Sequence, residues 1–218
     1  MNFLIQQSAF TSTCMKKNET ERTAAVILAA GGSTRLGRPK QLLDWFGKTF
    51  IEQVVETAIK ADLYPIIVVT GSNHKLIEDH LKKKDVEIIF NNNWKEGQSG
   101  SLTAGLKKIQ EKQISQFIFL LVDMPQLKEE WLKIIVQNSD DNNFDIVTTT
   151  VNGEVTPPIL FKEKCFEKLF SLKGDSGGKR LVSEFNTKYL EHEDQGMKLD
   201  CDTEEEYLQL LNTYKKCV

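Results

Sequence analysis

The sequence predicts an α/β protein built around a mostly parallel central sheet. Short apolar runs alternate with amphipathic segments, which is the pattern of βαβ units. The run 24–30 is continuously apolar, as expected for a strand that is buried on both faces. No internal repeat, low-complexity tract or linker interrupts the 218 residues, so we expect one domain over residues 23–218.

In the first half of the chain, the expected strands end in turn residues and the expected helices show one apolar face. The run 24–30 stops at Gly31-Gly32, which suits a buried strand that enters a tight turn. Apolar residues then recur at helical spacing over residues 50–59. The same alternation predicts, in order, a strand over 65–70, a helix over 73–83, a strand over 86–90 and a helix over 98–112.

The second half continues this alternation until Val151, where the pattern weakens. It predicts, in order, a strand over 117–122, a helix around 130–138, a strand over 145–150 and an apolar stretch at 159–161. A capping box, Thr203 to Glu206, marks the start of the last helix, because the threonine hydroxyl and the glutamate carboxylate bind free backbone N–H groups there. The buried face of this helix is expected to comprise Tyr207, Leu210, Leu211 and Tyr214.

Composition excludes several functional classes. The net charge of −3 argues against a nucleic-acid partner, because such proteins usually carry a basic excess. The four cysteines are scattered without a C-x-x-C pair, and the three histidines lack zinc-site spacing. No apolar run approaches the ~20 residues that span a bilayer, so no membrane partner is expected. Residues 1–22 lack the features of a signal peptide and are interpreted as a flexible N-terminal extension of a cytoplasmic protein.

The loop that follows the first strand carries the strongest chemical signal. Ligands of open parallel sheets bind beyond the carboxyl ends of the strands, and this loop lies at such an end. Gly31 and Gly32 allow backbone N–H groups to approach a phosphate closely. Arg35, Arg38 and Lys40 place three cations within six residues. A polyanionic ligand is the expected partner of this loop.

Two common phosphate-binding loops do not fit this segment. Gly32 and Gly37 have P-loop separation, but Arg38 and Pro39 stand where that motif has lysine and a hydroxyl residue. Pro39 also prevents a helix from beginning at that point. The dinucleotide pattern G-x-G-x-x-G is absent from the loop. The segment is therefore a third type of phosphate-binding loop.

Residues 28–40, Leu-Ala-Ala-Gly-Gly-Ser-Thr-Arg-Leu-Gly-Arg-Pro-Lys, closely resemble the signature loop of the nucleotidyltransferases that complete the molybdenum cofactor. The double-alanine form followed by Arg-Pro-Lys is more similar to the molybdopterin cytidylyltransferase branch than to the guanylyltransferase branch. The loop alone indicates a broad superfamily that includes sugar-phosphate nucleotidyltransferases. Further matches make the resemblance more specific and span about residues 24–214, at 91–97, 99–102, 121–125, 174–177 and 200–205.

The resemblance implies a Rossmann-like three-layer nucleotidyltransferase fold and a magnesium site. Asp123 would be the main Mg²⁺ ligand, although an aspartate before Pro125 also suits a helix cap. Asp202 would be the second metal-side residue. Asp200 would point the same way on an extended segment, so the sequence leaves the choice open and we favour Asp202. Both aspartates would also suit the N-terminus of the last helix without any metal.

The resemblance also implies roles for cations and turn residues around a nucleotide. Lys40 and Arg35 would neutralise the triphosphate and would form the catalytic set together with Asp123; surface salt bridges are the alternative for both cations. Ordinary turn chemistry is the alternative for Thr70, Gly71, Asn91, Gly100 and Ser101, which would line the base and ribose pocket. The complete expected nucleotide-binding set is Leu28, Ala29, Ala30, Gly31, Gly32, Arg35, Lys40, Thr70, Gly71, Asn91, Gly100 and Ser101.

The reaction implied by the resemblance is Mg²⁺-dependent transfer of a nucleotidyl group from CTP to the phosphate of molybdopterin. The alternatives are GTP as the donor, a sugar or polyol phosphate as the acceptor, or a non-catalytic accessory protein that delivers cofactor to a molybdenum hydroxylase. Two departures from the family pattern concern the acceptor side. Thr156-Pro157-Pro158 stands where Gly-x-Pro is usual, and Gly177-Gly178-Lys179 stands where Gly-Ala-Arg is common.

Overall fold

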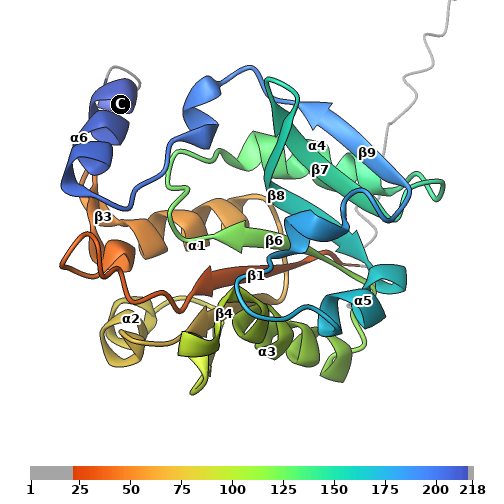
Figure 1. Cartoon of the computed structure of the whole chain (residues 1–218), viewed down its shortest axis with the longest axis horizontal. Coiled ribbons are helices and arrows are strands. Elements are labelled where there is room, and N and C mark those ends of the chain that lie inside the picture. The colour runs from red at the N-terminus through yellow and green to blue at the C-terminus, as the bar shows by residue number, and fades with distance from the viewer. Residues whose placement is uncertain (1–21, 216–218) are drawn as a thin grey trace, which may run out of the picture.

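A computed structural model describes residues 22–215 and contains a seven-stranded sheet of order β5-β4-β1-β6-β8-β7-β9 (Figure 1). Strand β8 runs antiparallel to β6 and β7, and every other pair of neighbouring strands in this sheet is parallel. The predicted mostly parallel sheet is therefore confirmed. The strands are β1 (Ala24–Ala29), β4 (Ile66–Thr70), β5 (Glu87–Phe90), β6 (Gln116–Leu121), β7 (Ile146–Val151), β8 (Glu154–Lys162) and β9 (Thr187–Glu191).

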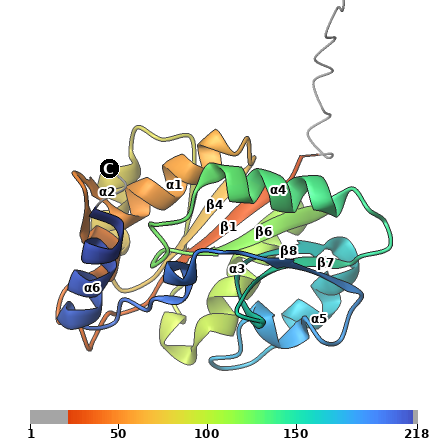
Figure 2. The same cartoon turned by 90° about the horizontal axis from the view of Figure 1, so that it is seen from above.

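Helices cover both faces of the sheet and give the molecule three layers. Figure 2 shows α1 and α4 on one side of the strands, and α3 and α5 on the other. Successive side chains of a strand point to opposite faces, and β1 therefore contributes to two cores. Ala25 and Ile27 pack in the core that contains α1 and α4, whereas Val26 and Leu28 pack against α3. The helices are α1 (Phe50–Lys60), α2 (His74–Leu81), α3 (Gln98–Glu111), α4 (Glu129–Ser139), α5 (Phe166–Phe170) and α6 (Glu204–Tyr214).

Several elements were not anticipated from the sequence pattern. A two-stranded hairpin, β2 (Asp44–Trp45) and β3 (Lys48–Thr49), lies between the glycine-rich loop and α1. Strand β8 begins at Glu154, well before the apolar stretch at 159–161. Strand β9 forms one edge of the sheet and is only partly buried, so its sequence has no continuous apolar run. These elements are either very short or exposed on one side, and such segments carry a weak hydrophobic signal.

The topology places the glycine-rich loop at the centre of one sheet edge. The chain passes from β1 to β4 and β5 on one side, and then returns to β6 on the other side of β1. Strands β1 and β6 are parallel with Leu28 opposite Leu121, so the residues that follow both strands emerge side by side. Both arrowheads point toward α6 in Figure 1. Beyond this switch in strand order, an open α/β sheet usually binds its ligand.

Several sequence predictions fall partly outside the described residues. The predicted extension over residues 1–22 is described only at Arg22, whose guanidinium lies 5.4 Å from the centroid of the Tyr64 ring. Cys14 and Cys217 also lie outside this range, whereas Cys165 and Cys201 are free and buried. None of the helices in residues 22–215 has the length and apolar character that crossing a bilayer requires.

Candidate active site

The glycine-rich loop is closed on itself by contacts of Ser33. The Ser33 backbone is left-handed, with φ 51°, and its carbonyl accepts a 3.1 Å hydrogen bond from the Gly37 N–H. Gly37 also has a positive φ of 72°, which glycine adopts at little cost. The Ser33 hydroxyl accepts a 2.9 Å bond from the Lys40 N–H. These bonds turn the chain back toward the sheet, so that Lys40 lies beside the strand ends.

A buried glutamine, Gln41, holds the start of the glycine-rich loop in place. This residue was not assigned to the site from the sequence. The Gln41 amide donates to the carbonyls of Ala29, at 3.0 Å, and Gly31, at 2.8 Å. Gln41 is almost fully buried, so these bonds satisfy two carbonyl groups where the strand gives way to the turn. Its only sequence signal is its place directly after the loop's last lysine. The neighbouring carbonyls that it satisfies cannot be read from sequence.

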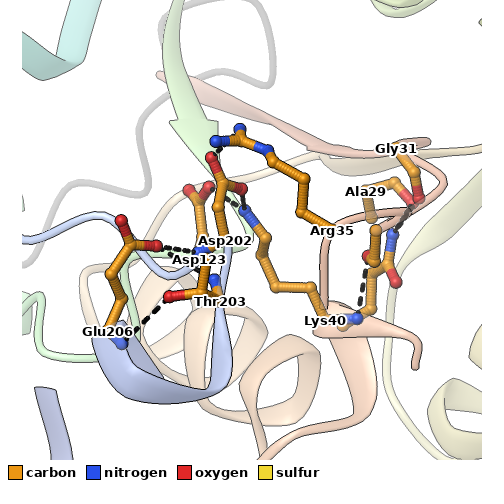
Figure 3. A network of polar contacts seen from close by, with 10 residues as sticks. Ala29, Gly31, Arg35, Lys40, Asp123, Asp202, Thr203 and Glu206 are labelled. Atoms are coloured by element: carbon orange, nitrogen blue, oxygen red, sulfur yellow. Dashed lines mark hydrogen bonds and ion pairs between the residues drawn. The ribbon is translucent and has the colours of Figure 1, made fainter. Parts of the chain in front are cut away.

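Lys40, Arg35, Asp123 and Asp202 meet at the carboxyl ends of β1 and β6 (Figure 3). The Lys40 ammonium lies 3.1 Å from the Asp123 carboxylate and also bonds to Asp202. Arg35 pairs with the other carboxylate oxygen of Asp202. The Lys40 side chain is 12% exposed and that of Arg35 is 70% exposed. Two carboxylates from distant parts of the sequence thus share one largely buried ammonium group.

Burial and ion pairing act in opposite directions on these groups. Burial alone would lower the pKa of Lys40, but the Asp123 charge and hydrogen bonds to both aspartates raise it above its usual value. Burial would raise the pKa of Asp202, but Lys40 and Arg35 outweigh burial and lower it. The pKa of Asp200 is raised by partial desolvation and by the neighbouring charges of Asp123 and Asp202. The site therefore holds charged, paired groups near neutral pH.

The N-terminus of α6 positions Asp202. Thr203 accepts a bond from the Glu206 N–H, and the Glu206 carboxylate accepts from the Thr203 N–H at 3.0 Å, so the predicted capping box is present. The same carboxylate accepts a 2.7 Å bond from the Asp202 N–H (Figure 3). The backbone of Asp202 is therefore tied to the first turn of α6, while its side chain points toward Lys40 and Arg35.

A cavity of about 400 Å³ opens above this cluster. Its wall brings together eight of the residues that the sequence predicts for the site: Leu28, Ala30, Gly31, Arg35, Lys40, Ser101, Asp123 and Asp202. Polar residues that sequence reasoning did not assign to the site also line it, among them Ser33, Thr34, Gln98 and Asp175. The volume is within the range of small-molecule sites.

The other predicted nucleotide-binding residues are not among those that line the cavity. The Thr70 hydroxyl donates to the Ile89 carbonyl at 3.1 Å and lies 2.9 Å from His74 Nδ1. The Asn91 amide donates to the Ser101 hydroxyl at 3.0 Å and thereby orients a cavity-lining side chain. Ala29 is fully buried in β1. A β-carbon on Gly100 would have its nearest atom 3.7 Å away, so an alanine would fit there.

The close packing of Trp94 explains why two of the predicted site positions are occupied by glycine. A β-carbon on Gly32 would lie 3.1 Å from the Trp94 ring, and one on Gly71 would lie 2.7 Å from Trp94 Cβ. The ring therefore packs against both turns, and it also lines the cavity. Sequence reasoning found the segment that contains Trp94 but gave the tryptophan no role. A large aromatic residue in a glycine- and asparagine-rich turn was the available signal.

One departure on the acceptor side has a packing explanation. Gly178 is buried, and a β-carbon at this position would lie 2.6 Å from Cζ of Phe161. The Phe161 ring thus occupies the space that an alanine would need. Lys179, the next residue, is exposed at the start of a 3₁₀ helix (Gly178–Leu181).

The carboxylates of the site have the chemistry that a magnesium ion requires. Within residues 22–215, His, Cys, Asp and Glu side chains form no group of three or more that could hold a metal by themselves. Mg²⁺ is often bound by one or two carboxylates together with substrate phosphates and waters. Asp123 and Asp202 supply two carboxylates around one cation, the Lys40 ammonium. This donor set fits Mg²⁺ in the presence of a bound triphosphate.

Comparisons with known proteins agree with this geometry. The profile of the family described as MobA-like NTP transferase domain matches residues 25–193. Purine catabolism protein PucB of Bacillus subtilis (strain 168) is 30% identical over 193 residues, which cover 84% of this chain and 92% of that protein. A probable molybdenum cofactor guanylyltransferase of Bacillus cereus (strain Q1) is 29% identical over 195 residues, covering 85% and 94%.

The fold also matches solved structures. The crystal structure of Rv0371c from Mycobacterium tuberculosis H37Rv superposes with a TM-score of 0.79 at 25% sequence identity. The match covers 88% of this chain and 99% of that one. The three-layer arrangement predicted from the sequence resemblance is therefore confirmed by independent comparison of structures.

Proposed function

The chain belongs to the MobA-like NTP transferase family of molybdenum cofactor nucleotidyltransferases, and from this premise we propose that it transfers the cytidylyl group of CTP to the phosphate of molybdopterin. The observation that carries the proposal is the Lys40 ammonium, which two aspartates hold at the base of a glycine-rich turn. A cation in this position is matched to a triphosphate that lies along the turn. A molybdenum hydroxylase is the proposed recipient of the product.

The reaction is an in-line displacement at the α-phosphorus of CTP. An oxygen of the molybdopterin phosphate forms a bond to this phosphorus, and the bond to the oxygen that bridges to the β-phosphorus breaks. Pyrophosphate leaves with the bonding electrons. The attacking phosphate is already anionic near neutral pH, so the protein need not supply a general base. Catalysis then depends on alignment and on neutralisation of charge.

Lys40 and Arg35 perform the charge neutralisation in this proposal. Both donate to Asp202, and Lys40 also donates to Asp123. Asp123 and Asp202 would hold Mg²⁺, which would supply positive charge to the phosphate oxygens. Lys40 and Arg35 bind the triphosphate and stabilise the charge that develops on pyrophosphate. Backbone N–H groups of the turn, around Gly31 and Gly32, add further donors.

The choice of CTP rests on the loop sequence, in which Ala29 and Ala30 precede the glycines and Arg-Pro-Lys follows. Ala30 and Leu28 both line the cavity. Ser101 contributes its hydroxyl to the base and ribose pocket, and Asn91 orients that hydroxyl through its side-chain amide. Thr70, Gly71 and Gly100 complete this pocket through their backbone and packing.

A pyrophosphate-release screen tests the proposed function. CTP, GTP, ATP and UTP are each incubated with molybdopterin and Mg²⁺, and release is measured over time. We expect CTP to give the highest rate. A preference for GTP would replace the base assignment, and release only with a sugar or polyol phosphate would replace the acceptor. Nucleotide binding without any release would favour the non-catalytic accessory protein.

Substitutions of the three aspartates test the metal assignment. We expect Asp123→Asn and Asp202→Asn to lower the rate by roughly a hundredfold or more, because each removes a carboxylate from the shared cluster. Asp200→Asn is the matched control, since it lies two residues from Asp202 and is exposed. Normal release by Asp123→Asn, or equal losses for Asp200→Asn and Asp202→Asn, would contradict this assignment.

A further inference from the structure

Arg38 does not act with the other two cations of the glycine-rich loop. Its side chain lies outside the cavity wall and forms two hydrogen bonds to the Glu204 carboxylate, at 2.7 and 2.8 Å. The guanidinium also lies 5.4 Å from the centroid of the Tyr207 ring. We refer to Arg38, Glu204 and Tyr207 together as the clasp. It joins residues that are 166 positions apart in the sequence.

The aromatic part of the clasp is rigidly held. Tyr207 is only 7% exposed, and its hydroxyl donates a 2.8 Å bond to the Asp44 carbonyl. Its ring packs edge-on against Phe50, with centroids 6.0 Å apart. Arg38 thus rests on a buried ring that is bonded at its far end. One guanidinium nitrogen of Arg38, Nη2, donates to both carboxylate oxygens of Glu204, while the planar group lies over the aromatic ring.

The clasp lies directly beside the proposed metal ligand. Glu204 is the first residue of α6 and lies two positions after Asp202. Arg35 and Lys40 bond to Asp202, while Arg38 bonds to Glu204, so the loop contacts this short segment at three points. Ser33 closes the base of the loop through Lys40, and Arg38 ties its outer part to the helix. Arg38 thus supplies one of the three loop contacts to the segment that carries Asp202.

We propose that Arg38 and Glu204 are positioning residues for the nucleotidyl transfer, and this inference rests on the proposed function. The clasp holds the loop and the start of α6 at a fixed separation, at which Arg35, Lys40 and Asp202 can act on the same triphosphate. Neither Arg38 nor Glu204 touches the nucleotide. Their effect passes through Asp202 and the cations of the loop.

Because the Arg38–Glu204 ion pair is exposed, a positioning role can be distinguished experimentally from a contribution to folding stability. The side chains of Arg38 and Glu204 are 50% and 54% exposed, and exposed ion pairs contribute little to folding stability. A displacement of about 1 Å in the position of catalytic groups can nevertheless lower a rate by as much as a hundredfold. A positioning role therefore predicts a large kinetic effect with a small change in melting temperature.

Charge exchange across the clasp is the direct test. We compare Arg38→Glu, Glu204→Arg and the double variant that carries both changes, with CTP, molybdopterin and Mg²⁺. Each single variant is expected to lower kcat/KM by roughly tenfold or more, because two like charges then push the loop away from α6. The double variant restores the ion pair and is expected to recover most of the loss. The melting temperature of each variant is measured in parallel.

A neighbouring glutamate provides the matched control. Glu205 lies in the same turn of α6 and, within residues 22–215, forms no ion pair. Glu204→Gln and Glu205→Gln remove the same charge from the same helix end, so any effect of the helix dipole is shared. We expect a lower kcat/KM and a weaker CTP affinity only for Glu204→Gln. The dissociation constant for CTP with Mg²⁺ provides a readout that does not require turnover.

Two results would contradict the proposed positioning role of the clasp. Unchanged kcat/KM and CTP affinity in the single variants would show that the pair positions nothing. Losses that persist in the double variant would show that Arg38 binds phosphate directly. Failure of the proposed function is recognised separately, because the wild-type protein itself would then fail to release pyrophosphate from CTP in the presence of molybdopterin.

Discussion

At the scale of single residues, Lys40 connects the glycine-rich loop to the end of β6 and to the segment that precedes α6. Its backbone N–H closes the loop on Ser33, and its ammonium bonds to Asp123 and Asp202. With 12% of the side chain exposed, water screens these charges less than it does at the surface. The two carboxylates keep Lys40 charged, and Lys40 in turn reduces the repulsion between them. One side chain therefore maintains the electrostatic balance of the site.

Removal of this charge should weaken nucleotide binding. We expect Lys40→Met, which retains much of the aliphatic stem, to lose roughly 1.5–3 kcal/mol of CTP binding free energy, as for a charged hydrogen bond. Isothermal titration with CTP and Mg²⁺ measures this loss. Lys108→Met is the control, because Lys108 pairs with Glu87 and Glu111 away from the cavity. Equal affinity of wild type and Lys40→Met would contradict the assigned role.

Sequence could identify some site residues and not others, for a physical reason. Asp123 closely follows the buried strand β6, so its position at a sheet edge can be read from an apolar run. Lys40 ends the glycine-rich loop that follows β1, and the loop's family resemblance identified it. Gln41 and Trp94 act through contacts with turns that are distant in sequence, and such contacts leave no local pattern. Arg38 belongs to the same basic cluster as Arg35, yet it turns away to Glu204.

At the scale of elements, α1 and α6 both begin with a capping box, but only the box at α6 contacts a residue of the site. Thr49 and Glu52 form a capping box at α1, and Thr203 and Glu206 form one at α6. Each box satisfies backbone N–H groups that the helix itself leaves unpaired. Only the second box also binds the backbone N–H of Asp202, through Glu206. Variants of the two caps can therefore distinguish a loss of helix stability from a change in the geometry of the site.

Substitutions in the two caps should lower the free energy of unfolding by similar amounts but should differ in their effect on kcat/KM. Thr49→Ala and Thr203→Ala are each expected to lower the free energy of unfolding by about 1 kcal/mol, measured by urea denaturation. Only Thr203→Ala should also lower kcat/KM, because its cap holds the segment that carries Asp202. A kinetic loss of the same size in Thr49→Ala would show that general destabilisation explains the effect.

The packing of α3 on the sheet depends on one glycine. A β-carbon on Gly105 would lie 2.5 Å from Val26 Cγ1 and 3.2 Å from Val69 Cγ2. The helix therefore approaches β1 and β4 more closely than an alanine would allow. This close approach brings the N-terminal end of α3, with Gln98 and Ser101, to the cavity.

Two glycine substitutions in α3 should have opposite effects on stability. Alanine at an ordinary helix position gains up to about 1 kcal/mol over glycine, and Gly100 has space for it. Gly105→Ala should instead be destabilising, because overpacking typically costs about 1–3 kcal/mol and exceeds that gain. Urea unfolding of both variants measures the difference. Stabilisation by Gly105→Ala would contradict the close packing of α3 on Val26.

At the scale of the whole molecule, the fold brings the site together from five separate segments. These are the loop after β1, the end of β6 with Asp123, the start of α3, the loop that carries Asp175 and the segment before α6. Apolar runs and helical periodicity made the parallel centre of this sheet predictable, because those strands are buried on both faces. The edge strand β9 and the N-terminal part of β8 were not predictable, because their burial depends on long-range pairing.

The meeting of α6 with the glycine-rich loop was also only partly predictable. The capping box located the start of the helix, and the family resemblance connected Asp202 with the metal. No sequence pattern indicated that Arg38 bonds to Glu204, because ion pairs across 166 residues depend on the completed fold. Local signals thus predicted the elements, whereas the contacts that complete the site required the structure.

The most direct test of the account is a crystal structure with a non-hydrolysable CTP analogue and Mn²⁺ in place of Mg²⁺, located by its anomalous scattering. The account predicts the triphosphate along the turn that contains Gly31, Arg35 and Lys40, with the metal bound to Asp123 and Asp202. Lys40 should then donate to phosphate oxygens. A turn without nucleotide, or a metal bound away from both aspartates, would contradict it.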